Sequence, residues 1–203
     1  MLEAVNLACA RGERRLFSGL NFSLRAGNSL QAFGRNGSGK TSLLRIVCGL
    51  MAPVAGEVRW EGTNIRRLGE EYFGAIAYVA HQNGVKDELS PIENLRISSG
   101  VAGHALSKQE AQAILECVGL SKQQHLPARL LSAGQRRRLA LSRLLASRAK
   151  LWILDEPLAS LDDDGASLTR NLIGEHLSND GMAIIATHQE MSLSAGQTQR
   201  IEL

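Results

Sequence analysis

Residues 34–41 form a glycine-rich run that carries the residue types needed to bind phosphate groups. The run reads GRNGSGKT. Its glycines tolerate positive φ and let backbone N–H groups close around a phosphate, and a helix beginning here adds the partial positive charge of its N-terminus. In such a pattern Lys40 reaches the β- and γ-phosphates of a nucleotide and Thr41 ligates Mg²⁺. We therefore predict a P-loop with the nucleotide-binding residues Gly34, Arg35, Asn36, Gly37, Ser38, Gly39, Lys40, Thr41 and Ser42.

Two adjacent carboxylates, Asp155 and Glu156, end the apolar stretch Leu151–Leu154. In P-loop enzymes an aspartate at this place holds Mg²⁺, directly or through water. Glu156 is free to polarise the attacking water as a general base if the metal does not occupy it. An acidic turn after a strand is common in isolation, but its combination with the P-loop favours nucleotide hydrolysis.

The elements that position these residues follow an alternating pattern. Apolar stretches at Asn28–Phe33, Ile76–Val79, Leu151–Leu154 and Ala183–Ala186 stand between longer amphipathic runs. Continuously apolar strands such as LWIL and AIIA are typical of a parallel sheet covered by helices on both faces. The sequence thus predicts an α/β protein with the P-loop between a strand and a helix.

Two further regions differ from this alternation. The segments LEAVNLACA, LNFSLRAG and GEVRWEG read as turn-bounded, alternating strands, and they predict an antiparallel β lobe. Residues 90–130 read as helical, with a capping box between Ser107 and Glu110. We expect one domain over residues 1–203, with a helical subdomain inserted at roughly 89–147.

The composition is that of a chain that folds in water. The hydrophobic fraction is 44%, the charged fraction is 21% and the net charge is only +3, so neither disorder nor a strongly basic surface is indicated. No run approaches 18 apolar residues and the first residues lack a secretion signal, so we expect no membrane span. The three cysteines are expected to be core thiols in a reducing cytosol. Arg136, Arg137 and Arg138 are expected to form a solvated helix start rather than a nucleic-acid site.

The segment Leu131–Gln135 reads LSAGQ and resembles the LSGGQ signature of ABC ATPases. Gln82 matches the glutamine of that family's Q-loop, Ser160–Asp162 its D-loop and His188 its switch histidine. The order and spacing of these motifs match the family over essentially the whole chain. The resemblance implies a P-loop NTPase of RecA-like core, with an antiparallel β lobe and a helical signature lobe.

The resemblance also implies a mechanism. Two copies pack head to tail as a homodimer, and each ATP lies between the P-loop of one copy and the signature of the other. Ser132, Gly134 and Gln135 are then nucleotide contacts, and Gln82 meets Mg²⁺ or the lytic water. The implied metal set is Thr41, Gln82 and Asp155, and the implied catalytic set is Lys40, Gln82, Glu156 and His188.

Two positions depart from the family pattern. Ala133 stands where the family usually has a second glycine, which places any positive φ there in question. Arg11 stands in place of the aromatic residue that stacks on adenine in this family, so either the Arg11 guanidinium or Phe17 is expected to take that role; the alternative is that Arg11 is a solvated arginine.

Residues 126–147, followed by LWILDEPLASLD and ATHQ, look like the ATP-binding subunit of the bacterial cytochrome c maturation system, a family described as haem exporter ATPases. That resemblance implies integral-membrane permease subunits, a place on the cytoplasmic face of the inner membrane, and haem delivery to the periplasm. No haem-binding motif is present, and His81, His104, His125 and His176 are expected to be surface or capping residues. The alternatives are the ATPase of another small ABC importer or exporter, or a non-transport regulatory ABC protein.

Overall fold

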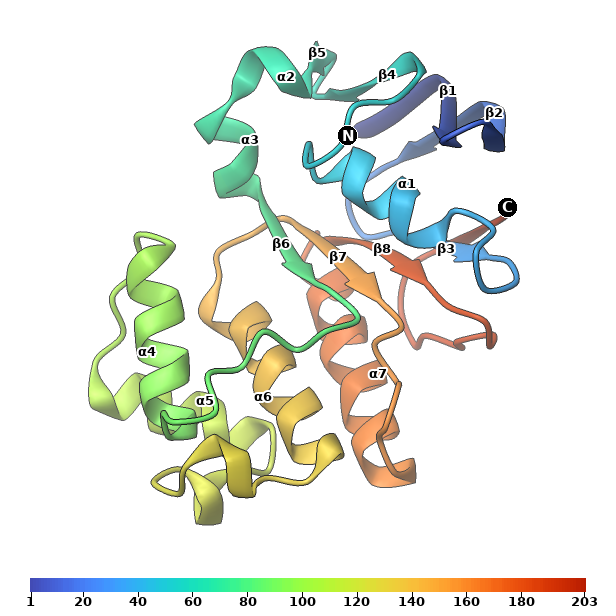
Figure 1. The fold of residues 1–203 in the computed structure, drawn as a ribbon. Helices are drawn as coiled ribbons and strands as arrows, with labels where there is room; N and C mark the ends of the chain where they lie inside the picture. The colour runs from blue at the N-terminus through green and yellow to red at the C-terminus, as the bar shows by residue number, and fades with distance from the viewer.

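The computed structural model describes residues 1–203, and its N-terminal part is an antiparallel sheet of order β2-β1-β4-β5 (Figure 1). The strands are β1 (Leu2–Arg11), β2 (Arg14–Leu24), β4 (Ala55–Trp60) and the short β5 (Thr63–Asn64). Strand β1 pairs with both β2 and β4. The antiparallel lobe predicted from the alternating segments is confirmed.

The second sheet is parallel and has the order β6-β7-β8-β3-β9. Its strands are β3 (Ser29–Phe33), β6 (Ile76–Val79), β7 (Leu151–Asp155), β8 (Met182–Ala186) and β9 (Thr198–Glu202). Every residue of β3, β7 and β8 is buried. This accounts for the absence of polar alternation in LWIL and AIIA, because helices cover both faces of the central strands.

Successive residues of these strands belong to two different cores. Ile153 and Ile184 pack in the larger cluster, which also contains α1 (Lys40–Val47) and the antiparallel lobe. Leu154 and Ile185 face the opposite way and pack in the cluster that contains α6 (Ala133–Ala146) and α7 (Asp163–Ser178). Figure 1 shows α6 and α7 on one side of the parallel sheet and α1 on the other. Successive side chains of a strand point to opposite faces of the sheet, and here both faces are buried.

A helical lobe with its own apolar cluster lies beside the parallel sheet. It contains α4 (Pro91–Val101), α5 (Lys108–Cys117), the 3₁₀ turns Ser121–Gln123 and Ala128–Leu130, and the start of α6. Ser90, Ser107 and Ser132 each cap a helix, and in each case the side chain three positions on accepts a hydrogen bond from the backbone N–H of the capping serine. The predicted capping box at Ser107 is confirmed, and two more occur in the same lobe.

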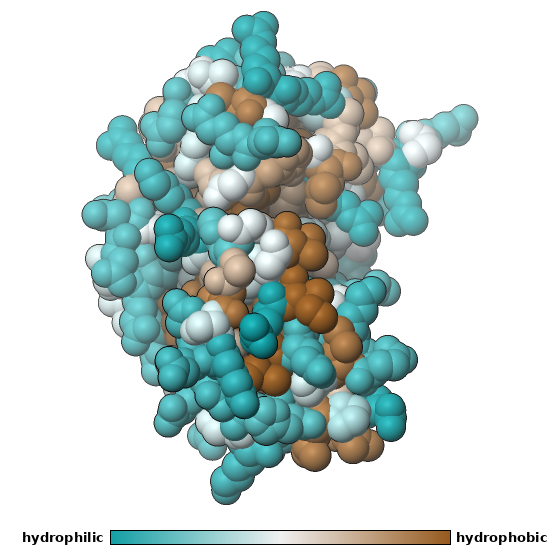
Figure 2. All heavy atoms as spheres, turned by 90° about the vertical axis from the view of Figure 1, so that its left-hand side faces the viewer, coloured by the Kyte–Doolittle hydropathy of each residue, from teal (hydrophilic) through white to brown (hydrophobic).

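Two short helices, α2 (Ile65–Leu68) and α3 (Glu70–Ala75), connect the sheets on the side that faces the viewer in Figure 2. This face carries apolar side chains that are open to solvent. Phe73 of α3 and Ile97 and Val101 of α4 are 52%, 52% and 86% exposed. No helix is both long enough and apolar enough to cross a membrane.

The expectation of three core thiols is wrong for one of them. Cys9 and Cys48 are buried, but Cys117 is exposed at the end of α5. The α5 helix buries only one side against the lobe, through Ala111 and Leu115. Cys117 falls on the side that remains in solvent, because an apolar sequence neighbourhood does not fix the direction of each side chain.

The expectation that His176 is a surface or capping residue is also wrong. Its ring stacks on Trp152 with centroids 3.9 Å apart and planes 5° apart, and Nε2 lies 3.1 Å from the Met182 carbonyl oxygen. Burial lowers the pKa of His176 below its ordinary value. The ring therefore packs as a neutral group.

This pKa shift predicts a loss of stability in acid. The unfolded chain binds a proton on His176 more readily than the folded chain, so the free energy of unfolding falls as the pH drops below the ordinary histidine value of about 6.5. Urea unfolding of the wild type and of His176→Gln between pH 8 and pH 5 measures the effect. We expect the wild type to lose more stability over this interval than the variant, and equal losses would contradict the assignment.

Candidate functional site

The carboxyl ends of four neighbouring strands bring the P-loop and three other predicted site residues to one edge of the parallel sheet. The P-loop follows β3, Asp155 ends β7, His188 follows β8 and Gln82 follows β6. Ligands of open α/β sheets bind outside this edge. Topology thus gathers residues that lie more than one hundred positions apart in the chain.

The P-loop backbone has the shape of an anion cradle. Gly39 precedes α1 with φ of 118°, and a Cβ there would come 3.2 Å from the Phe17 ring. Gly34 has φ of 153°, and a Cβ there would lie 2.8 Å from the carbonyl oxygen of Leu203. The Ser38 hydroxyl oxygen is buried without a hydrogen-bond partner. A buried polar group of this kind needs a partner, and a phosphate oxygen in the loop would provide one.

Lys40 is a buried cation at the start of α1, with 7% of its surface exposed. Its ammonium donates to the Gly34 carbonyl at 2.7 Å and lies 3.8 Å from Oε1 of Glu156. A buried ammonium is costly unless it is hydrogen-bonded and paired with negative charge. The side chain is therefore held across the mouth of the P-loop, where a phosphate would complete its neutralisation.

Thr41 and Asp155 form the second contact between the P-loop and the sheet edge. The Thr41 hydroxyl donates to Oδ2 of Asp155 at 2.8 Å, and Asp155 is only 2% exposed. A hydroxyl and a carboxylate are oxygen donors of the type that Mg²⁺ prefers. The pair fits a Mg²⁺ ion associated with a bound nucleotide.

Glu156 lies between Lys40 and His188. Its Oε2 is 2.9 Å from Nδ1 of His188, and its backbone has φ of 48°. A non-glycine residue with positive φ is uncommon, and such strain clusters at active sites. The carboxylate is thus oriented from two sides beside the Thr41–Asp155 pair.

Gln82 is exposed after β6, and its side chain makes no hydrogen bond. It lies at the same edge of the sheet as Asp155 and Glu156, but it forms no hydrogen bond with either of them. Its neighbours Ala80 and Asn83 are both fixed by Arg137.

The signature residues form a separate part of the structure. Ser132 caps α6, and Gln135 accepts a hydrogen bond from the Ser132 backbone at 2.9 Å. A Cβ on Gly134 would lie 2.9 Å from the Ser160 carbonyl, so this glycine serves close approach rather than positive φ. Ala133 is an ordinary helical residue, which removes the question raised by its replacement of glycine. No hydrogen bond joins Ser132, Gly134 or Gln135 to the P-loop of the same chain.

The two candidates for adenine stacking have different surroundings. Arg11 is exposed at the end of β1, where it pairs with Arg14 across the hairpin. Phe17 is half-buried and its ring lies against Gly39 of the P-loop. Both remain on the same hairpin, and Phe17 is the one in contact with the P-loop.

A cleft of about 680 Å³ beside the P-loop includes residues that sequence reasoning missed. Arg14, Arg200 and Glu202 line it together with His188 and the P-loop. Arg200 also lies over the Phe33 ring, 4.2 Å from its centroid. Strand β9 supplies Arg200 and Glu202, and its sequence TQRIE is too short and polar to have been recognised as a strand.

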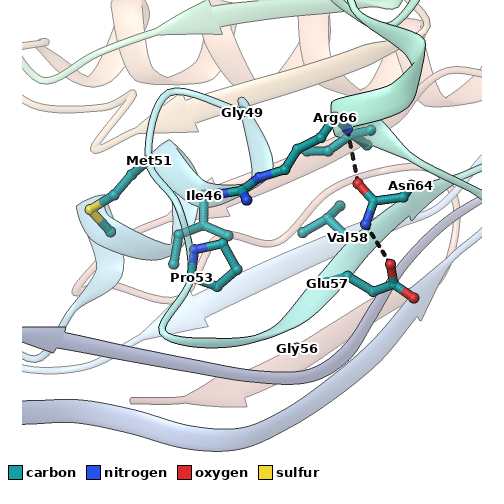
Figure 3. Close-up of a pocket in the computed structure, with 10 residues that line it drawn as sticks. Ile46, Gly49, Met51, Pro53, Gly56, Glu57, Val58, Asn64 and Arg66 are labelled. Atoms are coloured by element: carbon teal, nitrogen blue, oxygen red, sulfur yellow. Dashed lines mark hydrogen bonds between the residues drawn. The ribbon is translucent and has the colours of Figure 1, made fainter.

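A smaller pocket of about 50 Å³ lies in the antiparallel lobe, between α1 and β4 (Figure 3). Asn64 stands at its wall, donates to Glu57 and accepts from the Arg66 backbone at 2.9 Å. Every predicted site residue lies outside this pocket. Its volume leaves room for little more than water, and it carries no part of the site.

The chain is similar in sequence to known proteins. The family model described as ABC transporter matches residues 17–159. The chain is 52% identical over 202 residues to a protein of Nitrosospira multiformis named cytochrome c biogenesis ATP-binding export protein CcmA, covering 100% of this chain and 98% of the relative. The protein of the same name in Dechloromonas aromatica is 46% identical, with full coverage of both.

Solved structures show the same fold. An ABC transporter ATP-binding protein from Pyrococcus furiosus superimposes with a TM-score of 0.85 at 25% identity, covering 98% of this chain and 96% of that one. The cassette MJ0796, whose structure is described as dimeric, gives a TM-score of 0.79 at 22% identity, covering 93% of this chain and 88% of that one.

Proposed function

This chain belongs to the ABC transporter family and is an ATP-hydrolysing subunit of that family; we propose that it drives an export system for c-type cytochrome biogenesis. The P-loop NTPase core, antiparallel lobe and helical lobe have the arrangement of ABC cassettes. Relatives that cover the whole chain are named cytochrome c biogenesis ATP-binding export proteins. We also propose that residues 1–203 act as one ATPase domain with a helical subdomain at roughly 89–147.

The position of Glu156 carries the proposal for the chemistry. Its carboxylate lies 3.8 Å from the Lys40 ammonium and 2.9 Å from His188, next to the Thr41–Asp155 pair. Glu156 is therefore held beside the phosphate-binding lysine, while Asp155 is available to bind the metal. Nucleotide hydrolysis needs both functions, a base that orients the attacking water and a ligand for Mg²⁺.

Each residue has a distinct part in the proposed reaction. The backbone of the P-loop, the Ser38 hydroxyl and the Lys40 ammonium bind the β- and γ-phosphates. Thr41 and Asp155 would hold Mg²⁺, and the metal would supply positive charge that neutralises the phosphates. Glu156 accepts the proton of the water that attacks the γ-phosphorus, and the bond to the bridging oxygen breaks to release ADP and phosphate. His188 orients Glu156, and Gln82 contacts the water or the metal.

The proposed partners are a second copy of the chain and integral-membrane permease subunits at the cytoplasmic face of the inner membrane. The second copy would supply Ser132, Gly134 and Gln135, since these residues do not reach the P-loop of their own chain. The exposed apolar side chains of Phe73 in α3 and of Ile97 and Val101 in α4 support a protein contact at these helices, because burial of such side chains against a partner is favourable.

The proposed role in c-type cytochrome biogenesis can be tested in cells from which the gene for this chain has been deleted. Expression of the chain should restore c-type cytochromes, measured by haem staining of periplasmic fractions. The chain should also co-purify from solubilised membranes with the membrane subunits of the same system. Unchanged cytochrome c content in the deletion strain would reject the export role and leave the ATPase assignment standing.

Glu156→Gln tests the chemical assignment. The amide keeps the shape of the side chain but cannot accept the proton, so we expect turnover to fall by about 10²- to 10⁴-fold while ATP remains bound. ATP turnover with the membrane subunits present and equilibrium nucleotide binding are the two measurements. Glu190→Gln is the matched control, because Glu190 is exposed two residues beyond His188 and forms no ion pair. Loss of ATP binding in Glu156→Gln would assign this residue to the metal instead.

A further inference from the structure

Arg137 is a buried arginine that none of the motifs described above includes. Its residue surface is 2% exposed, although it was expected to belong to a solvated helix start. It lies in the second turn of α6, and the side chain points inward from the helix to the parallel sheet. Arg136 and Arg138, for which the same was expected, are only partly buried, and their guanidinium groups donate to carbonyls within the helical lobe.

The Arg137 guanidinium makes five hydrogen bonds, and no carboxylate oxygen accepts any of them. One set goes to the last residue of β7 and the two residues after it: Nη2 donates to the carbonyls of Asp155 at 2.7 Å and Glu156 at 2.9 Å, and Nε donates to the carbonyl of Pro157 at 3.3 Å. The other set goes from Nη1 to the Ala80 carbonyl at 2.8 Å and to Oδ1 of Asn83 at 3.1 Å. The planar fork of an arginine can reach several acceptors at once, which a lysine cannot do.

These bonds hold a strained part of the backbone. Glu156 has φ of 48°, and the residue after it is a proline. Strained conformations persist only where the surroundings over-determine them. Here the carbonyls of three consecutive residues are fixed by one side chain, while the Glu156 amide donates to the Ala186 carbonyl at 2.9 Å.

We propose that Arg137 is a positioning residue for ATP hydrolysis: it fixes the backbone of Glu156 and couples it to the Gln82 segment. This inference rests on the proposed role of Glu156 as general base. Arg137 acts through the carbonyl groups of Asp155, Glu156 and Pro157 and touches neither the nucleotide nor the attacking water. The same guanidinium also binds Ala80 and Asn83, which flank Gln82. A displacement of this segment would therefore move Arg137 and alter its hydrogen bond to the Glu156 carbonyl.

The test separates catalysis from binding. Arg137→Gln retains a polar side chain but loses most of the donors, so we expect kcat to fall by about 10- to 100-fold, the cost of a displacement of the order of 1 Å at a catalytic group. The Lys40 and Thr41 contacts stay in place, so ATP affinity should remain within about twofold of the wild type. Arg137→Lys keeps the buried positive charge but has fewer hydrogen-bond donors, so its kcat should lie between the values of the wild type and of Arg137→Gln. Both are measured on the full chain with its membrane subunits.

Arg138→Gln is the matched control. Arg138 lies on the same helix, and its guanidinium donates to the carbonyls of Val118 at 3.2 Å and Gly119 at 3.4 Å, both in the helical lobe. This variant should keep kcat within about twofold. Thermal unfolding of all variants is recorded beside turnover, so that a loss of fold is recognised and Arg137→Lys then carries the test.

A double-mutant cycle with Glu156→Gln decides whether the effect passes through Glu156. If it does, Arg137→Gln should change the residual turnover of Glu156→Gln by less than about threefold, because coupled residues are not additive. An equal loss in both backgrounds, a parallel loss of ATP affinity, or wild-type kcat in Arg137→Gln would overturn the proposal. A fully active Glu156→Gln would instead reject the proposed role of Glu156, so the two failures are distinguishable.

Discussion

Lys40→Ala is expected to abolish ATP hydrolysis and to weaken nucleotide binding. Lys40 is the cation held across the mouth of the P-loop by the Gly34 carbonyl and by Glu156. Its removal deletes the charge opposite the β- and γ-phosphates, both in the bound state and in the transition state. Hydrogen bonds to charged groups contribute about 1.5–3 kcal/mol, so ATP affinity should fall by about 10- to 100-fold. Turnover should fall by about a thousandfold or more.

Two measurements and one control define this result. ATP turnover is assayed with the membrane subunits present, and ATP affinity is measured at equilibrium. Lys150→Ala removes an exposed lysine just before β7 and should leave both values unchanged. Wild-type turnover in Lys40→Ala would refute the P-loop assignment.

The place of the P-loop in the fold could be predicted from the sequence because local patterns specify it. A P-loop such as GRNGSGKT follows a strand and precedes a helix. The segments on either side of it are apolar enough to be predicted as that strand and that helix. The same holds for LWILDE, where the end of a buried strand places Asp155 and Glu156 at the ligand-binding edge. These predictions depend on a few adjacent residues and on the period of their apolar neighbours.

Contacts between distant segments could not be predicted in this way. Arg137 reaches residues at positions 80–83 and 155–157 only because α6 packs against β6 and shares an apolar cluster with β7. Its sequence context, three consecutive arginines, is typical of a solvated face. The same limit applies to Arg200, which enters the cleft because β9 pairs with β3 at the sheet edge.

Ser132→Arg is expected to leave nucleotide binding by the single chain nearly intact and to eliminate hydrolysis. Ser132 caps α6 in the helical lobe and forms no hydrogen bond to its own P-loop. Its contribution to a bound nucleotide therefore requires a second copy, as we propose. A bulky cation at this position blocks the approach of the opposing P-loop by size and by charge. ATP affinity at low protein concentration and turnover at concentrations that permit dimers measure the two effects.

Mixing two inactive variants tests whether the site is shared. Ser132→Arg retains its P-loop and Lys40→Ala retains its signature, so a mixed dimer contains one intact site and one site with both defects. We expect each variant alone to be inactive and the mixture to recover part of the wild-type turnover. Random pairing of equal amounts gives about half mixed dimers, each with one of two sites intact, so recovery should approach about a quarter if the sites act independently. Full turnover of Ser132→Arg alone would exclude a shared site, because that preparation contains no intact signature.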